Sequence, residues 1–219
     1  MALSRLKYNS LNVTPTASKG IGFDSGADDL AATFSGGSMT FIKKLTASSS
    51  ATLSFVDGAD SVVLDSTYKE YVFTFNNIHP ATGNTQLTFQ GNAAGGADYN
   101  ETITSTAFMA FHTEAGGSPT LTYDTGRDLA QSTSFQDCTG DIGAENDECG
   151  SGYLHLFNPS STTFVKHFIG RASSYHPSDR ENDTYFAGYF NTTSAIDEIQ
   201  FKQSSGNIDA GDICLYGIN

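Results

Sequence analysis

The sequence predicts an all-β protein, an antiparallel β-sandwich of jelly-roll-like type with an extended N-terminal arm. Short segments that alternate apolar and polar residues, separated by clusters of Gly, Asn, Asp and Ser, indicate this fold. The 219 residues include 16 Phe, 10 Tyr and 22 Gly but no Trp. A Phe/Tyr core of this size suits one large β domain or two small ones. About ten strands would require two packed sheets.

Residues 1–37 are predicted to form the arm and the loops that follow it, for attachment or subunit contact. Its apolar residues are isolated in polar sequence, and Pro15 stops any helix. Such a segment is poorly held by itself, so it is either a frayed terminus or a segment that docks on a neighbouring subunit. Five glycines and three aspartates between Gly20 and Gly37 indicate loops. The candidate assembly residues are Leu3, Leu6, Tyr8 and Leu11.

The sandwich is predicted over residues 38–219, with an irregular insertion at about 91–150. The clearest strand is 70–76, where Tyr71, Phe73 and Phe75 alternate with smaller residues. Two segments, 152–157 and 163–169, are predicted to form a hairpin. The other predicted strands are 38–46, 52–56, 62–64, 86–90, 104–112, 121–123, 185–190, 196–202 and 212–217. Polar loops are predicted over 137–152 and 173–184.

Charge and hydropathy exclude several classes of partner. The chain carries 11 Lys and Arg against 24 Asp and Glu, a net charge of −13 that repels nucleic-acid phosphates. A cation or a neutral surface such as a sugar is an easier partner. Since no run of about 18 apolar residues occurs, no membrane span is expected. The N-terminal residues have no apolar segment of the signal-peptide type, so we expect a cytosolic protein or one released within a particle.

The chain has three cysteines, Cys138, Cys149 and Cys214. An odd and small number of cysteines does not form a full disulfide framework. Cys138 and Cys149 bracket the acidic loop and could pair in an oxidising medium. Two reduced thiols are the favoured interpretation for a protein made in the cytosol.

The acidic loop raises the question of a bound cation, because hard cations take several oxygen ligands that lie close in sequence. Gly140 and Gly143 supply bends, but the spacing does not match an EF-hand. The alternative is a solvated or assembly-facing loop, and no other cofactor is expected. The candidate ligands are Asp137, Asp141, Glu145 and Asp147, with Glu148 beside them.

Catalytic signatures are weak. The chain has no G-x-S-x-G motif, and its five histidines lie in no known catalytic pattern. His155 and His167 flank the predicted hairpin turn, where packing or hydrogen bonding is the favoured role. Carboxylate-pair hydrolysis of glycans stays open, because the sequence does not fix the distances between carboxyl groups. The acids concerned are Asp28, Asp29, Asp124, Asp128 and those of the loop at 137–148.

Tyrosine has a flat apolar face and a polar tip, so an exposed tyrosine suits stacking on a sugar ring or a partner surface. Tyr175 and His176, beside the polar loop at 173–184, are the candidate recognition residues. Tyr185 and Tyr189 are interpreted as core residues.

Four segments carry a resemblance to a known family: residues 1–7, 43–58, 68–80 and the C-terminal 207–218, which ends in Leu-Tyr-Gly-Ile. Together they resemble tailed-phage virion proteins common in marine phages. In that family a β-sandwich closes on a hydrophobic strand of this kind, and the role is structural, often fibre-like. The resemblance covers most of the chain, with 91–150 least included, and brings no catalytic residues.

The resemblance implies a non-enzymatic virion component, either a head fibre or decoration protein or a tail fibre or tip protein. It would be made in the host cytoplasm and released by lysis. Its partners would be other virion proteins, further copies of the chain, commonly in threefold symmetry, and a host-surface glycan. A glycan-binding, lectin-like module and a glycan-cleaving enzyme are the alternative functions.

Overall fold

The computed structural model describes residues 19–23, 30–35, 38–117 and 119–219, with side chains described from residue 38 onward. The chain divides into two compact units, residues 1–40 and 41–219. Every regular element in the described ranges is a strand, which confirms the predicted all-β class. In this part of the chain no helix has the length and apolar character needed to cross a membrane.

The first unit contains the strands β1 (Lys19–Phe23) and β2 (Leu30–Ser35), which pair antiparallel. The prediction of loops over 20–37 was therefore wrong for these residues. The glycines in 19–23 and the Gly and Asp clusters on either side of 30–35 obscured both strands, although Leu30 and Phe34 have the same parity, as a strand pattern requires.

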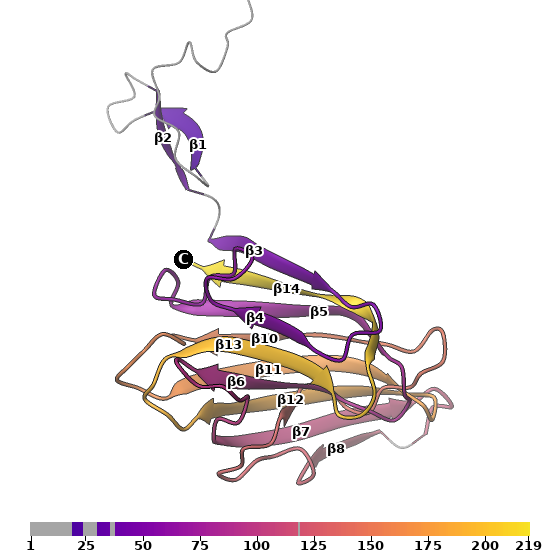
Figure 1. Ribbon diagram of the computed structural model, residues 1–219. Helices are drawn as coiled ribbons and strands as arrows, with labels where there is room; N and C mark the ends of the chain where they lie inside the picture. The colour runs from indigo at the N-terminus through magenta and orange to yellow at the C-terminus, as the bar shows by residue number, and fades with distance from the viewer. Residues whose placement is uncertain (1–18, 24–29, 36–37, 118) are drawn as a thin grey trace, which may run out of the picture. The chain divides into compact units, whose positions relative to one another are not determined.

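The second unit is built on two antiparallel sheets, which confirms the predicted β-sandwich (Figure 1). The larger sheet has eight strands in the order β3-β14-β5-β10-β11-β12-β7-β8, and the smaller has four in the order β4-β13-β6-β9. This order does not confirm the jelly-roll-like type. The strands of the large sheet are β3 (Met39–Thr46), β14 (Ile208–Ile218), β5 (Glu70–Pro80), β10 (Gly150–Phe157), β11 (Lys166–His176), β12 (Arg180–Phe190), β7 (Ile103–Thr113) and β8 (Thr120–Tyr123). Those of the small sheet are β4 (Leu53–Val56), β13 (Ile196–Gln203), β6 (Leu87–Ala93) and β9 (Gln136–Asp137).

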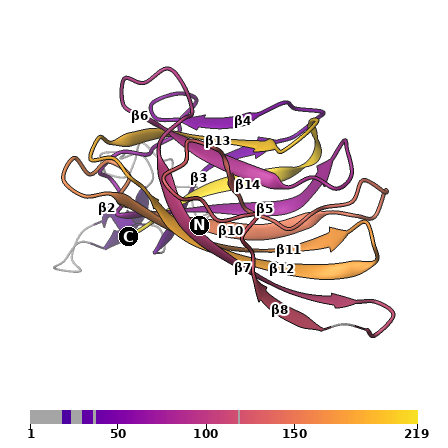
Figure 2. The ribbon, with the colours of Figure 1, turned by 90° about the horizontal axis from the view of Figure 1, so that it is seen from below.

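The core lies between the two sheets and is dominated by phenylalanine. Figure 2 shows β4, β13 and β6 lying over the broad sheet. Phe89 of β6 is fully buried, and its ring centroid lies 5.1 to 6.2 Å from those of four other phenylalanines. Two of these contacts are edge-to-face and two are tilted, and aromatic pairs at such distances add to the free energy of burial. The four partners are Phe168, Phe186 and Phe190 of the large sheet and Phe201 of the small sheet.

Two predicted elements were wrong. Residues 62–64 are not a strand but part of a turn region, in which the Leu64 amide donates to Asp57 Oδ1 at 2.8 Å. Val62 and Leu64 are nevertheless buried. The apolar pattern of these residues therefore indicates that they are buried, not that they form a strand. Residues 173–184 are not a polar loop, because β11 and β12 continue through them with only a short turn between. Their polar residues sit on a sheet, not in a loop.

The predicted hairpin is confirmed, since β10 and β11 pair antiparallel, although β11 begins only at Lys166. The stretch 91–150 contains the predicted strands at 104–112 and 121–123, as β7 and β8, together with the short β9. β7 pairs with β12 over its whole length, so this stretch contributes directly to the large sheet.

Candidate functional site

The outer face of the large sheet is the candidate functional surface. Alternation along β11 turns Phe168, Gly170 and Ala172 toward the small sheet and leaves Ile169 and Arg171 on the outside. The same alternation on β12 buries residues of one parity and places the others outside. The outer face is therefore a second surface, independent of the core, on the same strands.

Five large side chains line up across this face on five adjacent strands. Strand register pairs Tyr153 with Arg171, Arg171 with Tyr185, Tyr185 with Phe108 and Phe108 with Tyr123. We call this set the cross-strand row. Four strand spacings of about 4.8 Å make it roughly 19 Å long. Isolated exposed aromatics need no explanation, but an in-register row of them is an extended exposed patch of the kind that marks interaction sites.

The rings of the cross-strand row differ in what they offer to a ligand. Phe108 and Tyr185 stack at 4.6 Å between centroids with an interplanar angle of 7°, and the Arg171 guanidinium lies 4.7 Å from the Tyr185 centroid. Tyr185 is thus covered on both faces. The end residues Tyr153 and Tyr123 are 39% and 51% exposed. Tyr185 is held between its two neighbours, whereas Tyr153, the 43% exposed Phe108 and Tyr123 supply accessible ring surface.

Polar contacts fix the row. Arg171 donates two hydrogen bonds to Asp183, from Nε at 2.9 Å and Nη2 at 2.7 Å, and the Tyr185 hydroxyl donates to the same carboxylate at 3.1 Å. At the far end, the Tyr123 hydroxyl donates to Asp128 at 2.7 Å. A bidentate pair of this kind also fixes orientation.

The predicted core positions of Tyr185 and Tyr189 were wrong. Both lie half-buried on the outer face, because β12 turns Phe186 and Phe190 inward instead. The His167 ring contacts Tyr189 on this face at 5.7 Å, and His155 is hydrogen-bonded to Glu70. Both histidines therefore have the packing and hydrogen-bonding roles that were favoured for them.

The candidate recognition residues Tyr175 and His176 end β11 and point to opposite faces. Tyr175 is half-buried on the outer face, and its hydroxyl lies 3.4 Å from Asp179. His176 is only 8% exposed and faces inward. Its Nδ1 accepts the Ser178 amide at 3.0 Å, which leaves Nε2 as the donor toward Asp141 at 3.5 Å. The structure does not bring the two residues together as one surface.

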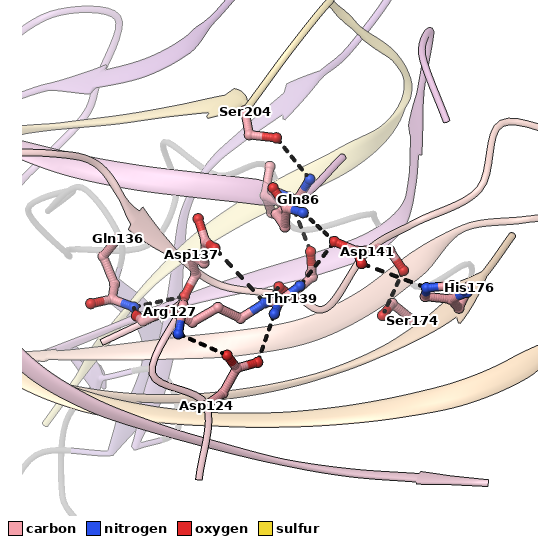
Figure 3. Close-up of polar contacts among 12 residues, drawn as sticks. Gln86, Asp124, Arg127, Gln136, Asp137, Thr139, Asp141, Ser174, His176 and Ser204 are labelled. Carbon is pink, nitrogen blue, oxygen red and sulfur yellow. Dashed lines mark hydrogen bonds and ion pairs between the residues drawn. The ribbon is translucent and has the colours of Figure 1, made fainter. Parts of the chain in front are cut away.

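A cluster around Arg127 holds two of the candidate metal ligands (Figure 3). Nη1 of Arg127 lies 2.6 Å from Asp124, Nη2 lies 2.9 Å from Asp141, and Nε lies 3.8 Å from Asp137. Nε also donates to the Thr139 carbonyl at 3.3 Å. The guanidinium occupies the point on which the three carboxylates converge and supplies the positive charge there.

Burial raises the pKa of Asp137 to about 7, and the negative charges of Asp141 and Asp124 act in the same direction, while Arg127 opposes them. Burial also lowers the pKa of His176, and Arg180 adds to this effect. The cluster therefore combines a carboxyl group that titrates near neutrality with a neutral imidazole. The cluster connects the loop after β8, which holds Asp124 and Arg127, with Asp137 at the end of β9 and His176 at the end of β11.

The other two candidate metal ligands lie elsewhere. Asp147 lines a hollow of about 420 Å³ with His79 and Asp209, and the Glu145 carbonyl accepts from His79 at 3.1 Å. Among residues with described side chains, no three His, Cys, Asp or Glu side chains are grouped as a metal site. The four acids do not converge. The arm residues Leu3, Leu6, Tyr8 and Leu11, and the acids Asp28 and Asp29, lie outside the described residues.

All three cysteines are free, and burial raises the pKa of the Cys138 thiol well above its ordinary value. The structure does not join Cys138 to Cys149, and the reduced state favoured from the sequence stays a prediction.

Sequence reasoning missed Arg127, Tyr153, Arg171, Glu181 and Asp183. The only local signal for Arg127 is the i,i+3 spacing from Asp124, which is a common surface pattern. For the others, the signal would have been the register of the β10–β11 and β11–β12 hairpins. That register sets Arg171 opposite both Tyr153 and Tyr185.

Comparisons of the chain with protein-family models, with curated proteins and with solved structures found no match. The residues and their geometry therefore carry the functional argument.

Proposed function

We propose that the protein is a non-enzymatic structural component of a tailed-phage virion, a fibre, decoration or tip protein that works through surface contacts. Its partners are other virion proteins and further copies of the chain, and its sandwich contributes to host attachment. The four segments that resemble marine-phage virion proteins support the particle assignment.

The observation that carries the proposal is the cross-strand row on the outer face of the large sheet. A stacked cross-strand pair stabilises a sheet by itself, but a row that continues over five strands with exposed rings goes beyond one such pair and supports a contact function. The division of the chain near residue 40 supports a separate attachment segment. In this proposal the arm attaches the subunit, and the sandwich presents the row to its surroundings.

Antibodies against residues 41–219 test the particle assignment. On intact particles released from the host, we expect labelling at a fixed station, seen by electron microscopy. Particles that carry no label and no peptides of the chain by mass spectrometry would refute the proposal. Native mass spectrometry of the full chain tests the arm. The expected homo-oligomer should dissociate when Leu3, Leu6 and Leu11 are changed to Ser, while the sandwich stays folded.

A further inference from the structure

A groove runs beside the cross-strand row on the outer face. Three adjoining hollows of about 390, 220 and 440 Å³ lie there, and Glu181 lines all three. Ser151 and Ser173 are shared by the first two, and Asp183 by the first and third. The hollows therefore adjoin one another along a line that crosses β10, β11, β12 and β7.

Strand register explains why the groove exists. Ser151 pairs with Ser173, Ser173 with Asp183 and Asp183 with Ala110, so small or short side chains make a continuous floor. On each strand, the member of the cross-strand row lies two residues from the floor residue, and the row forms one wall of the groove. Tyr175, Glu181 and His112, in register with one another, form the other wall. The groove follows directly from a row of small residues between two rows of large ones.

The groove has the chemistry of a polyol site. Tyr153 supplies an accessible ring whose apolar face suits the C–H face of a sugar. The Arg171–Asp183 pair offers fixed donors and acceptors, and the Ser173 hydroxyl donates to Glu181 at 3.0 Å. Carboxylates accept hydrogen bonds from hydroxyl groups, and groups that are already fixed lose little entropy on binding.

Charge favours one class of ligand. Asp183 and Glu181 line the groove of a chain with a net charge of −13, so phosphates and uronates are repelled. The core of a protein–protein contact is usually depleted of charged residues. Here a carboxylate on the floor, Asp183, and one on a wall, Glu181, line the groove, which argues against a second copy as occupant.

We propose that this groove binds a neutral oligosaccharide, which stacks on Tyr153 and directs hydroxyl groups to Glu181 and to the Arg171–Asp183 pair. The inference rests on the proposed attachment role and names its ligand class. Because the groove crosses four strands, roughly 14 Å between the outermost two, it suits an extended chain of several sugars and not a single one.

The test uses the full chain and a panel of neutral β-glucan, α-mannan and galactan oligosaccharides, with alginate oligomers as the anionic counterpart. Binding is measured by array and then by titration calorimetry. We expect binding of at least one neutral class and none of alginate. Tyr153→Ala and Glu181→Gln should each weaken binding about tenfold or more. Phe41→Ala is the matched control, because Phe41 is a 56% exposed aromatic outside the groove, and it should leave affinity unchanged.

Thermal unfolding checks that the variants fold. Binding of no neutral sugar, preference for alginate, or equal binding by Tyr153→Ala would overturn the inference. If Tyr153→Ala instead abolishes self-association seen by native mass spectrometry, the face is a subunit contact and the inference is also overturned. Particle labelling is independent of sugar binding, so failure here leaves the virion assignment standing, and the reverse holds as well.

Discussion

The two faces of β11, β12 and β7 use the same kinds of residue for different ends. On the inner face, the rings of Phe168 and Phe186 lie within a set of fully or nearly fully buried phenylalanines. On the outer face, Tyr185 and Phe108 stack with part of their surface in solvent and with charged neighbours. The inner rings are buried in the core. The outer rings stay partly exposed to solvent, and polar contacts hold them in place. On each of these strands, the inner side chains contribute to the core, and the outer side chains belong to the face for which a contact function is proposed.

Truncation of one aromatic on each face gives the largest expected contrast. Phe89→Ala removes the ring that contacts four others in the core, so it should lower the free energy of unfolding by about 3 to 5 kcal/mol. Phe108→Ala removes a 43% exposed ring and should cost about 1 kcal/mol, the value of one stacked pair. Urea unfolding at neutral pH measures both. Similar losses would mean that the outer row is structural.

Asp137→Asn tests the buried charge cluster through pH. In the folded chain the pKa of Asp137 is about 7, against an ordinary value of 3.8. Between these values the unfolded chain loses its proton first, so the contribution of Asp137 to stability falls as pH rises from about 4 to 7. The variant stays neutral at every pH. Its unfolding free energy should match the native protein near pH 4 and exceed it by about 2 to 4 kcal/mol at pH 8.

The comparison is between the native protein and Asp137→Asn, whose unfolding free energies are measured over the same range of pH. Denaturant unfolding at steps of pH provides both curves. A constant difference between the two curves would show that this carboxyl group is ionised in the folded chain.

Gly170→Ala tests how closely the inner face is packed. A Cβ atom on Gly170 would lie 2.1 Å from Cζ of Phe186, whose ring is buried in the core and has little room to move. Overpacking of this kind should cost about 1 to 3 kcal/mol. The neighbouring Ile169→Ala on the outer face removes a 52% exposed side chain and should shift the urea midpoint less. The reverse order would contradict the assignment of faces along β11.

The alternation of residues 70–76 predicted the sandwich and its core. One face of each sheet has to be buried, and phenylalanine side chains bury a large apolar surface area there. The alternation did not predict Lys166, which is fully buried on β11 and donates to the Thr192 carbonyl at 3.1 Å. A carbonyl partner 26 residues away carries no signal in a single sequence. Local pattern therefore fixes which face is apolar, while buried polar pairs depend on tertiary neighbours.

The same limit applies to the candidate site. The acidic charge predicted a cation or a neutral surface as partner, and Tyr175 and His176 were named for recognition. Of these two, only Tyr175 lies on the outer face. The cross-strand row needs the relative register of five strands, and a shift of one residue would turn its members to the other face. Arg127 joins Asp124, Asp137 and Asp141 only through folding of the loop that separates them.

The smallest effect on stability is expected for Arg171→Gln, and Arg127→Gln serves as the comparison with a large expected effect. Arg171→Gln breaks a pair in which the Arg171 side chain is 49% exposed and the Asp183 side chain 18% exposed, so it should cost at most about 1 kcal/mol and move the urea midpoint little. Arg127→Gln leaves carboxylates without their buried cation and should cost about 3 to 5 kcal/mol. If Arg171→Gln lowers the midpoint as much as Arg127→Gln, the outer pair holds the fold together. The contact function proposed for that face would then rest on the aromatic rings of the cross-strand row alone.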